Sequence, residues 1–163
     1  VVVSMGLEPL HEEVYYDFAH RFFEAKKGSF SQEMFHEVYQ RFNGVTRSIQ
    51  LILNKLYETE KNVCSEAQIN EAILHIVNQS SMQYEELMNI VTDNQQALMK
   101  AIAKEGCVVS PQGDEFIKRY NLPSASSVKT ALDVLLDKDL VFRTQAGYII
   151  YDHFLAVWLN RLY

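Results

Sequence analysis

The sequence lacks the long apolar segments and export signals that define membrane and secreted proteins. Its apolar runs, such as Tyr148 to Tyr151, hold at most six residues, far fewer than the roughly 20 that cross a bilayer as a helix. No basic stretch followed by an apolar segment and a small-residue cleavage site opens the chain. We therefore expect a cytoplasmic protein that neither spans nor enters a membrane.

Cysteine is scarce, and no cluster of metal-ligand residues is evident. Cys64 and Cys107 are far apart in sequence, and neither belongs to a C-x-x-C pair, which favours two inert thiols in a reduced compartment. None of the five histidines is paired with a cysteine or a carboxylate at the spacing of metal ligands. We expect no metal site; these histidines are His11, His20, His36, His75 and His153.

A phosphate-binding loop is also missing. The six glycines never form the G-x-x-x-x-G-K-[ST] or G-x-G-x-x-G pattern that brings backbone N–H groups to a nucleotide phosphate. No Ser/His/Asp or Cys/His set is singled out by the sequence either. The chain alone therefore contains no complete catalytic site.

Basic residues are outnumbered in the first part of the chain. Residues 1–92 carry 7 Lys and Arg against 13 Asp and Glu, so 7 − 13 = −6, whereas residues 93–163 carry 8 of each. This step in charge predicts a domain boundary near Thr92. Because phosphate contacts favour a clear basic excess, the charge of neither part favours extensive DNA binding.

Helical periodicity dominates residues 1–92. Residues 11–27 predict an aromatic-faced helix. The sequence Ser29 to Gln32 predicts the capped start of a second helix, and a third is expected over about residues 46–58. The box Ser65 to Gln68 opens a fourth helix, and residues 82–91 predict a shorter fifth. The buried stripe of the first helix is predicted to be Val14, Phe18, Phe22 and Ala25, widened by Tyr15 and Phe23.

Residues 93–163 follow the order of elements in a winged helix. A capping box from Thr92 to Gln95 opens one helix, residues 115–120 predict a second, and a third follows Ser124. A hairpin turns at residues 145–147, where Gly147 is expected to need a positive φ, and Asp152 caps a closing helix. The predicted fold class is mainly α, with a helical bundle before a winged helix-turn-helix domain that has a small hairpin.

The third of these helices is the one that reads DNA in winged-helix proteins. Its Ser124 also fits a purely structural interpretation as an ordinary N-cap after Pro123, and Asp133 and Asp137 on the same helix would repel phosphate. DNA contact and a structural role both remain open. The candidate DNA-binding residues are Ser124, Ser126, Ser127, Lys129 and Thr130, with Lys118, Arg119 and Arg143 as phosphate contacts.

Arg47 lies in the first turn of the third predicted helix, three residues after Gly44. A helix N-terminus favours anions, so the helix dipole does not stabilise an arginine there. Another anion should hold it, and the residues alone favour a neighbouring carboxylate and a bound phosphate equally.

Five segments, taken in order, resemble the C-terminal part of AAA+/STAND ATPases, in particular the prokaryotic archaeal-ATPase group. The resemblance covers nearly the whole chain, and its specificity comes from the order and spacing of these segments. The segments are Tyr16 to Ala19, Phe42 to Gln50, Ala101 to Gly106, Leu122 to Val128, and Gly147 to Leu159.

This resemblance implies that residues 1–92 form the helical lid of an ATPase and residues 93–163 its winged-helix domain. Gly44 and Arg47 are then similar to the sensor-2 motif, in which an arginine reaches the terminal phosphate, although Thr46 stands where many STAND members have proline. The expected partner is an upstream P-loop ATPase core that binds ATP and Mg²⁺, and Val1-Val2-Val3 is interpreted as a remnant of the connection to it. The 163-residue chain alone is expected to bind neither ATP nor Mg²⁺.

The function implied is the coupling of nucleotide state to double-stranded DNA or to protein. One alternative is a stand-alone winged-helix DNA-binding regulator whose acidic helical half serves for dimerisation. Another is a structural adaptor in which both helical faces only pack against protein.

Overall fold

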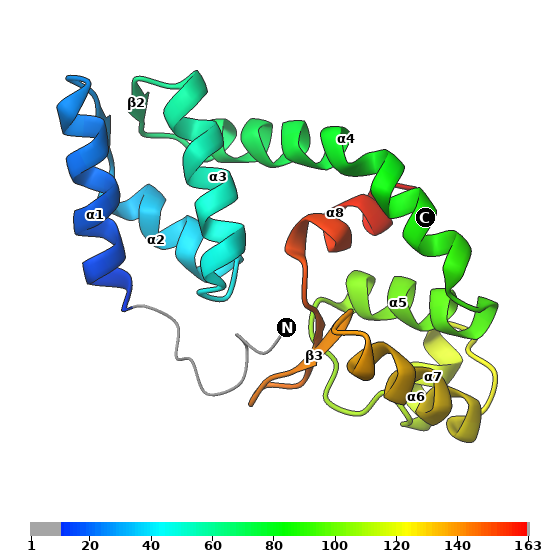
Figure 1. Cartoon of the computed structure of the whole chain (residues 1–163). Coiled ribbons are helices and arrows are strands. Elements are labelled where there is room, and N and C mark those ends of the chain that lie inside the picture. Colours follow the sequence, from blue (N-terminus) through cyan, green and yellow to red (C-terminus); the bar gives the residue numbers. More distant parts are fainter. Residues whose placement is uncertain (1–10, 163) are drawn as a thin grey trace. The chain divides into compact units, whose positions relative to one another are not determined.

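The computed structural model describes residues 11–162, in which the chain is mainly helical and forms two compact units that divide after Gln79, residues 11–79 and 80–162 (Figure 1). The division falls inside helix α4 (Glu66–Ile90), earlier than the boundary near Thr92 that the charge step predicts. Val1-Val2-Val3 lies outside the described residues.

Helix α4 corrects the prediction of separate fourth and fifth helices. The polar segment from Asn78 to Ser81 contains neither glycine nor proline, so its backbone continues the helix through the expected gap. Tyr84 and Met88, from the expected fifth helix, are buried and belong to the same helix as Ile73 and Val77.

Residues 11–79 contain α1 (Glu12–Ala25), α2 (Gln32–Arg41), α3 (Thr46–Thr59) and the first part of α4. Their hydrophobic core is rich in aromatic rings, with Phe30 packed edge-on against Phe23 and Phe35 at centroid distances of 5.2 and 5.7 Å. Other fully buried side chains in this core are Phe42, Ile49, Ile52, Leu56 and Ile69.

The buried face of α1 differs from the prediction. Tyr15, Ala19 and Phe23 are buried, whereas Val14, Phe18 and Phe22 are 60%, 60% and 51% exposed. Apolar residues occur around more than half of this helix, so periodicity alone does not fix which face turns inward. The small side chain of Ala19, between two aromatic residues that fit the core, decides the orientation.

Two short strands, β1 (Ser29–Phe30) and β2 (Asn62–Val63), form a parallel pair that the sequence analysis did not predict. The Ser29 and Ser31 N–H groups donate to the carbonyls of Lys61 and Val63, at 3.1 and 2.9 Å. The expected capping box at Ser29 is therefore wrong by two residues, because Ser31 is the N-cap of α2 and accepts from the Met34 N–H.

The second unit has the winged-helix order. It contains α5 (Asp93–Glu105), α6 (Asp114–Arg119), α7 (Ala125–Asp137) and α8 (His153–Leu162), with strands β3 (Val141–Arg143) and β4 (Tyr148–Ile150). β3 and β4 are antiparallel, and after α5 the chain adds a single antiparallel bridge between Val108 and Tyr148. Its buried residues include Leu98, Met99, Ile102, Val128, Leu135, Val141, Phe154 and Leu159.

Several local predictions in this unit are confirmed. Thr92 and Gln95 form the complete capping box of α5, and Ser124 caps α7 by accepting the Ser127 N–H at 3.2 Å. Asp152 accepts the Phe154 N–H at 2.9 Å. Gly147 has a φ of +145°, and a Cβ there would lie 2.6 Å from the Val108 carbonyl oxygen, so the hairpin requires glycine.

Candidate functional site

Arg47 lies in the first turn of α3, where its exposed side chain forms no ion pair with any carboxylate of residues 11–162. The N-cap of this helix is Val45, which has no side chain to accept the first backbone N–H groups. These donors and the guanidinium therefore form a positive end of α3 that is free to take an anion.

The turn before α3 explains this placement. Asn43 and Gly44 have φ values of 53° and 68°, and the Gly44 N–H donates to the Tyr39 carbonyl at 3.0 Å while the Asn43 N–H donates to Gln40. These two bonds form a Schellman motif, which ends α2 and reverses the chain within a few residues. Gly44 thus positions Arg47 through the backbone, as a residue of the turn.

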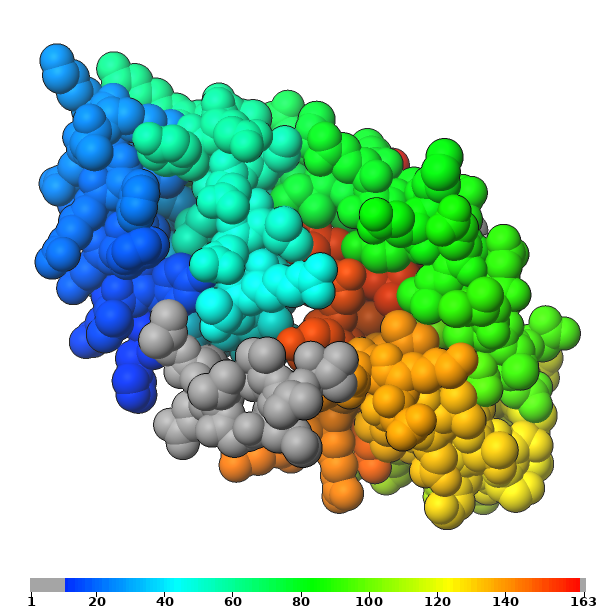
Figure 2. Space-filling model, viewed as in Figure 1, coloured from blue at the N-terminus to red at the C-terminus, as the bar shows by residue number. Residues whose placement is uncertain are grey.

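A groove between α1 and α3 lies on the same unit and was missed by the sequence analysis. It has a volume of about 260 Å³ and is lined by Phe18 and Phe22 of α1 and by Gln50, Leu53 and Asn54 of α3, among others. Figures 1 and 2 show the two helices side by side, blue for α1 and turquoise for α3. Burial at its floor raises the pKa of the Tyr15 phenol.

The exposed start of α7 gathers the hydroxyl groups of the predicted DNA-binding set. Ser124 bonds to the hydroxyls of Ser126 and Ser127 at 3.1 and 3.0 Å, and Thr130 donates to the Ser126 carbonyl. A hollow of about 330 Å³ separates this cluster from the start of α5, with Thr92, Asn94 and Gln95 on its far side. The cluster is accessible, but its hydroxyls largely bond to one another.

Two of the predicted DNA-binding residues, the phosphate contact Arg119 and the helix residue Lys129, form ion pairs with carboxylates. Arg119 pairs with Glu105 and with Glu115, and its hydrogen bond is the main reason that the pKa of the Glu105 carboxyl lies below its usual value. Lys129 lies 3.4 Å from Asp133. Residues 80–163 carry 8 basic and 10 acidic residues, a net charge of 8 − 10 = −2. The exposed Lys118 and Arg143 form no ion pair with the described residues.

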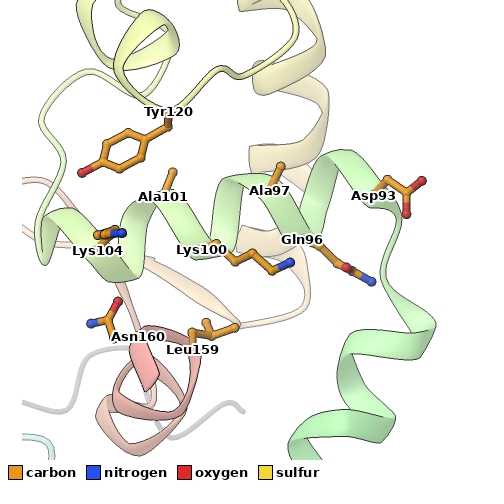
Figure 3. Close-up of a pocket in the computed structure, with 9 residues that line it drawn as sticks. All are labelled: Asp93, Gln96, Ala97, Lys100, Ala101, Lys104, Tyr120, Leu159 and Asn160. Atoms are coloured by element: carbon orange, nitrogen blue, oxygen red, sulfur yellow. The ribbon is translucent and has the colours of Figure 1, made fainter. Parts of the chain in front are cut away.

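Another hollow of the second unit, about 430 Å³, lies along α5 (Figure 3). Lys100 and Lys104 occupy one side of the helix there, between Tyr120 and Asn160. The Tyr120 hydroxyl donates to Glu105 at 2.8 Å and the Asn160 amide donates to the Ala103 carbonyl at 3.0 Å, so these groups already have partners. Asp93 also lines the hollow and offsets the lysine charge.

No metal centre and no membrane-spanning element is present within the described part of the chain. No group of three or more His, Cys, Asp or Glu side chains converges there. Single contacts do occur, since His36 lies 2.6 Å from Glu12 and His20 lies 3.0 Å from Glu24. Among residues 11–162, no helix has both the length and the apolar character needed to cross a bilayer.

Residues 82–161 match the family described as a probable winged helix domain, in agreement with the order of helices and hairpin in the second unit. No curated protein matches the chain.

Among solved structures, the chain is similar to the Walker-type ATPase PABY2304 of Pyrococcus abyssi, with a TM-score of 0.68 and 14% sequence identity. The similarity covers 93% of this chain and 42% of that one, so the chain spans less than half the length of the ATPase that it resembles. At this level of identity the likeness concerns the fold alone.

Proposed function

We propose that this chain is the lid and winged-helix portion of an ATP-dependent switch, with Arg47 as the residue that senses the nucleotide. The observation that supports the proposal most strongly is the likeness of 93% of the chain to 42% of a Walker-type ATPase. The chain has no phosphate-binding loop, so the proposal places a P-loop core with its ATP and Mg²⁺ upstream in the same polypeptide.

The chemistry of Arg47 fits this role. Its guanidinium forms no ion pair with a carboxylate among the described residues, and Arg47 belongs to the first turn of α3, whose N-cap has no side-chain hydrogen bond. A terminal phosphate at this position would receive a charge-assisted hydrogen bond together with the favourable end of the helix dipole. Because this contact exists only while that phosphate is attached, hydrolysis releases it and frees the lid to change its angle.

The winged-helix unit is the proposed output of the switch, through DNA or through protein. Its accessible α7 start favours a contact surface, whereas its net negative charge and the carboxylate partners of Arg119 and Lys129 weaken the case for DNA. Fluorescence anisotropy with a labelled duplex distinguishes the two outputs. Affinity that falls steeply with salt, and that decreases when Lys118 or Arg143 is changed to Ala, supports DNA.

ATP turnover tests the proposal. The 163-residue chain is expected to hydrolyse no ATP above background, whereas the polypeptide that includes the upstream P-loop core hydrolyses it. In that polypeptide, Arg47→Ala should lower kcat by about tenfold or more, and Arg47→Lys should restore only part of it, because a lysine cannot contact two phosphate oxygens at once.

Lys61→Ala is the matched control, because Lys61 is an exposed cation of the same unit away from the α3 N-terminus. Its turnover should equal that of the unmodified protein. ATP turnover by the 163-residue chain alone that is lost on Arg47→Ala would contradict the proposal that hydrolysis requires an upstream P-loop core. The absence of a P-loop from the upstream sequence would contradict it as well.

A further inference from the structure

Helix α1 presents an apolar ridge, Val14, Phe18 and Phe22, that no described residue covers. The rings of Phe18 and Phe22 lie 4.9 Å apart, and Phe22 meets the half-exposed Tyr57 edge-on at 6.4 Å. Large aromatic side chains in solvent, one beside another, are unfavourable unless another surface covers them. The ridge therefore marks a contact surface.

The groove beside this ridge is lined on one side by residues of α3, the helix that carries Arg47. Gln50 and Asn54 line the groove and follow Arg47 by three and seven positions on α3. Residues at that spacing share one face of a helix. A domain that presents a nucleotide phosphate to Arg47 would therefore lie next to the groove.

The size of the ridge disfavours a second copy of the chain as its partner. Two phenylalanines and a valine, each half exposed or more, leave on the order of 300 Å² of apolar surface. A stable interface between separate proteins buries about 800 Å² on each partner. An attached body needs less area, since the linker supplies an effective concentration in the millimolar range.

We propose that the upstream nucleotide-binding core of the same polypeptide packs on the ridge and the α1–α3 groove. The proposal rests on the proposed function, and it names the surface by which the lid is held beside the nucleotide. The similar ATPase has more than half of its length outside the matched region, which is room for such a body. Docking on Phe18 and Phe22 would fix α3 so that Arg47 faces the phosphate.

Hydrogen exchange in the intact polypeptide tests the docking surface without relying on ATP. The test variant is Phe18→Ser with Phe22→Ser, and the conservative variant is Phe18→Leu with Phe22→Leu. The control is Met82→Ser with Ile90→Ser, at apolar positions of another helix that are 73% and 72% exposed. In residues 46–57 the serine pair should raise amide exchange by about tenfold or more, and the other two pairs should leave it within about twofold. In the 163-residue chain alone the serine pair should leave the unfolding temperature unchanged, which shows that the first unit still folds.

Unchanged exchange with the serine pair in the intact polypeptide would overturn the docking proposal, while an effect of Arg47→Ala on ATP turnover would leave the proposed function standing. The reverse result, faster exchange with no effect of Arg47→Ala, would retain the docking surface and reject the nucleotide sensor. If analytical ultracentrifugation shows a dimer that the serine pair converts to monomers, the partner is a second copy and the proposal is wrong.

Discussion

Replacing Gly28 by alanine should destabilise the first unit, because backbone atoms already occupy the place of the new methyl group. An alanine Cβ at this position would lie 2.0 Å from the Lys61 carbonyl oxygen and 3.3 Å from that of Phe23. The Lys61 carbonyl accepts the Ser29 N–H, so the chain cannot move apart without weakening the β1–β2 pair. The loss of two backbone hydrogen bonds and the displacement of Phe30 from the core predict a cost of about 2–4 kcal/mol.

Two spectroscopic signals separate this effect from the stability of the rest of the chain. The single tryptophan, Trp158, lies in the second unit, so its fluorescence follows that unit, while far-UV circular dichroism follows both. Gly28→Ala should lower the unfolding temperature by circular dichroism and leave the fluorescence transition in place. Ser29→Ala is the control, because it removes only a side-chain bond to Asn62 and keeps the backbone pair. An alanine variant that unfolds like the unmodified chain would refute the role assigned to the close approach at Gly28.

Substitutions at three further positions test the second unit by its tryptophan fluorescence transition. Asp139→Gly should stabilise the unit by about 1 kcal/mol, since Asp139 has a φ of 58° at the end of α7, and no gain would contradict that strain. Thr92→Ala should cost about 1 kcal/mol because it removes the capping box with Gln95, whereas Thr92→Ser should cost little. The pKa of Glu105 is lowered chiefly by the Arg119 hydrogen bond, so its stabilisation is complete above the unfolded pKa and is lost as pH falls through the folded one. Glu105→Gln should therefore be less stable at neutral pH and should lose less stability on acidification, and parallel pH profiles would contradict this.

The winged-helix unit could be predicted because its signals are local. Ser124 after Pro123, the box at Thr92, and Gly147 at the hairpin tip each specify a cap or a turn through bonds that span only a few residues. Tertiary packing had little freedom to override them. The order of the elements followed directly.

The first unit was less predictable because its strands are very short and because the apolar pattern of α1 does not fix its buried face. The strands β1 and β2 hold two residues each, too few to show alternation, and their pairing depends on the close approach at Gly28. In α1 the periodicity allowed two faces, and the sequence favoured the one that the structure leaves in solvent. The α1–α3 groove was missed for this reason, whereas Arg47 was singled out by its position after Gly44 and stays a prediction as a site residue.

The affinity of the intact polypeptide for ATP and for ADP, measured side by side, tests the nucleotide-sensing role of Arg47 most directly. If Arg47 contacts the terminal phosphate, Arg47→Ala should weaken the binding of a non-hydrolysable ATP analogue by about tenfold or more and leave ADP binding unchanged. Equal losses for the two nucleotides, or no loss for either, would contradict the account.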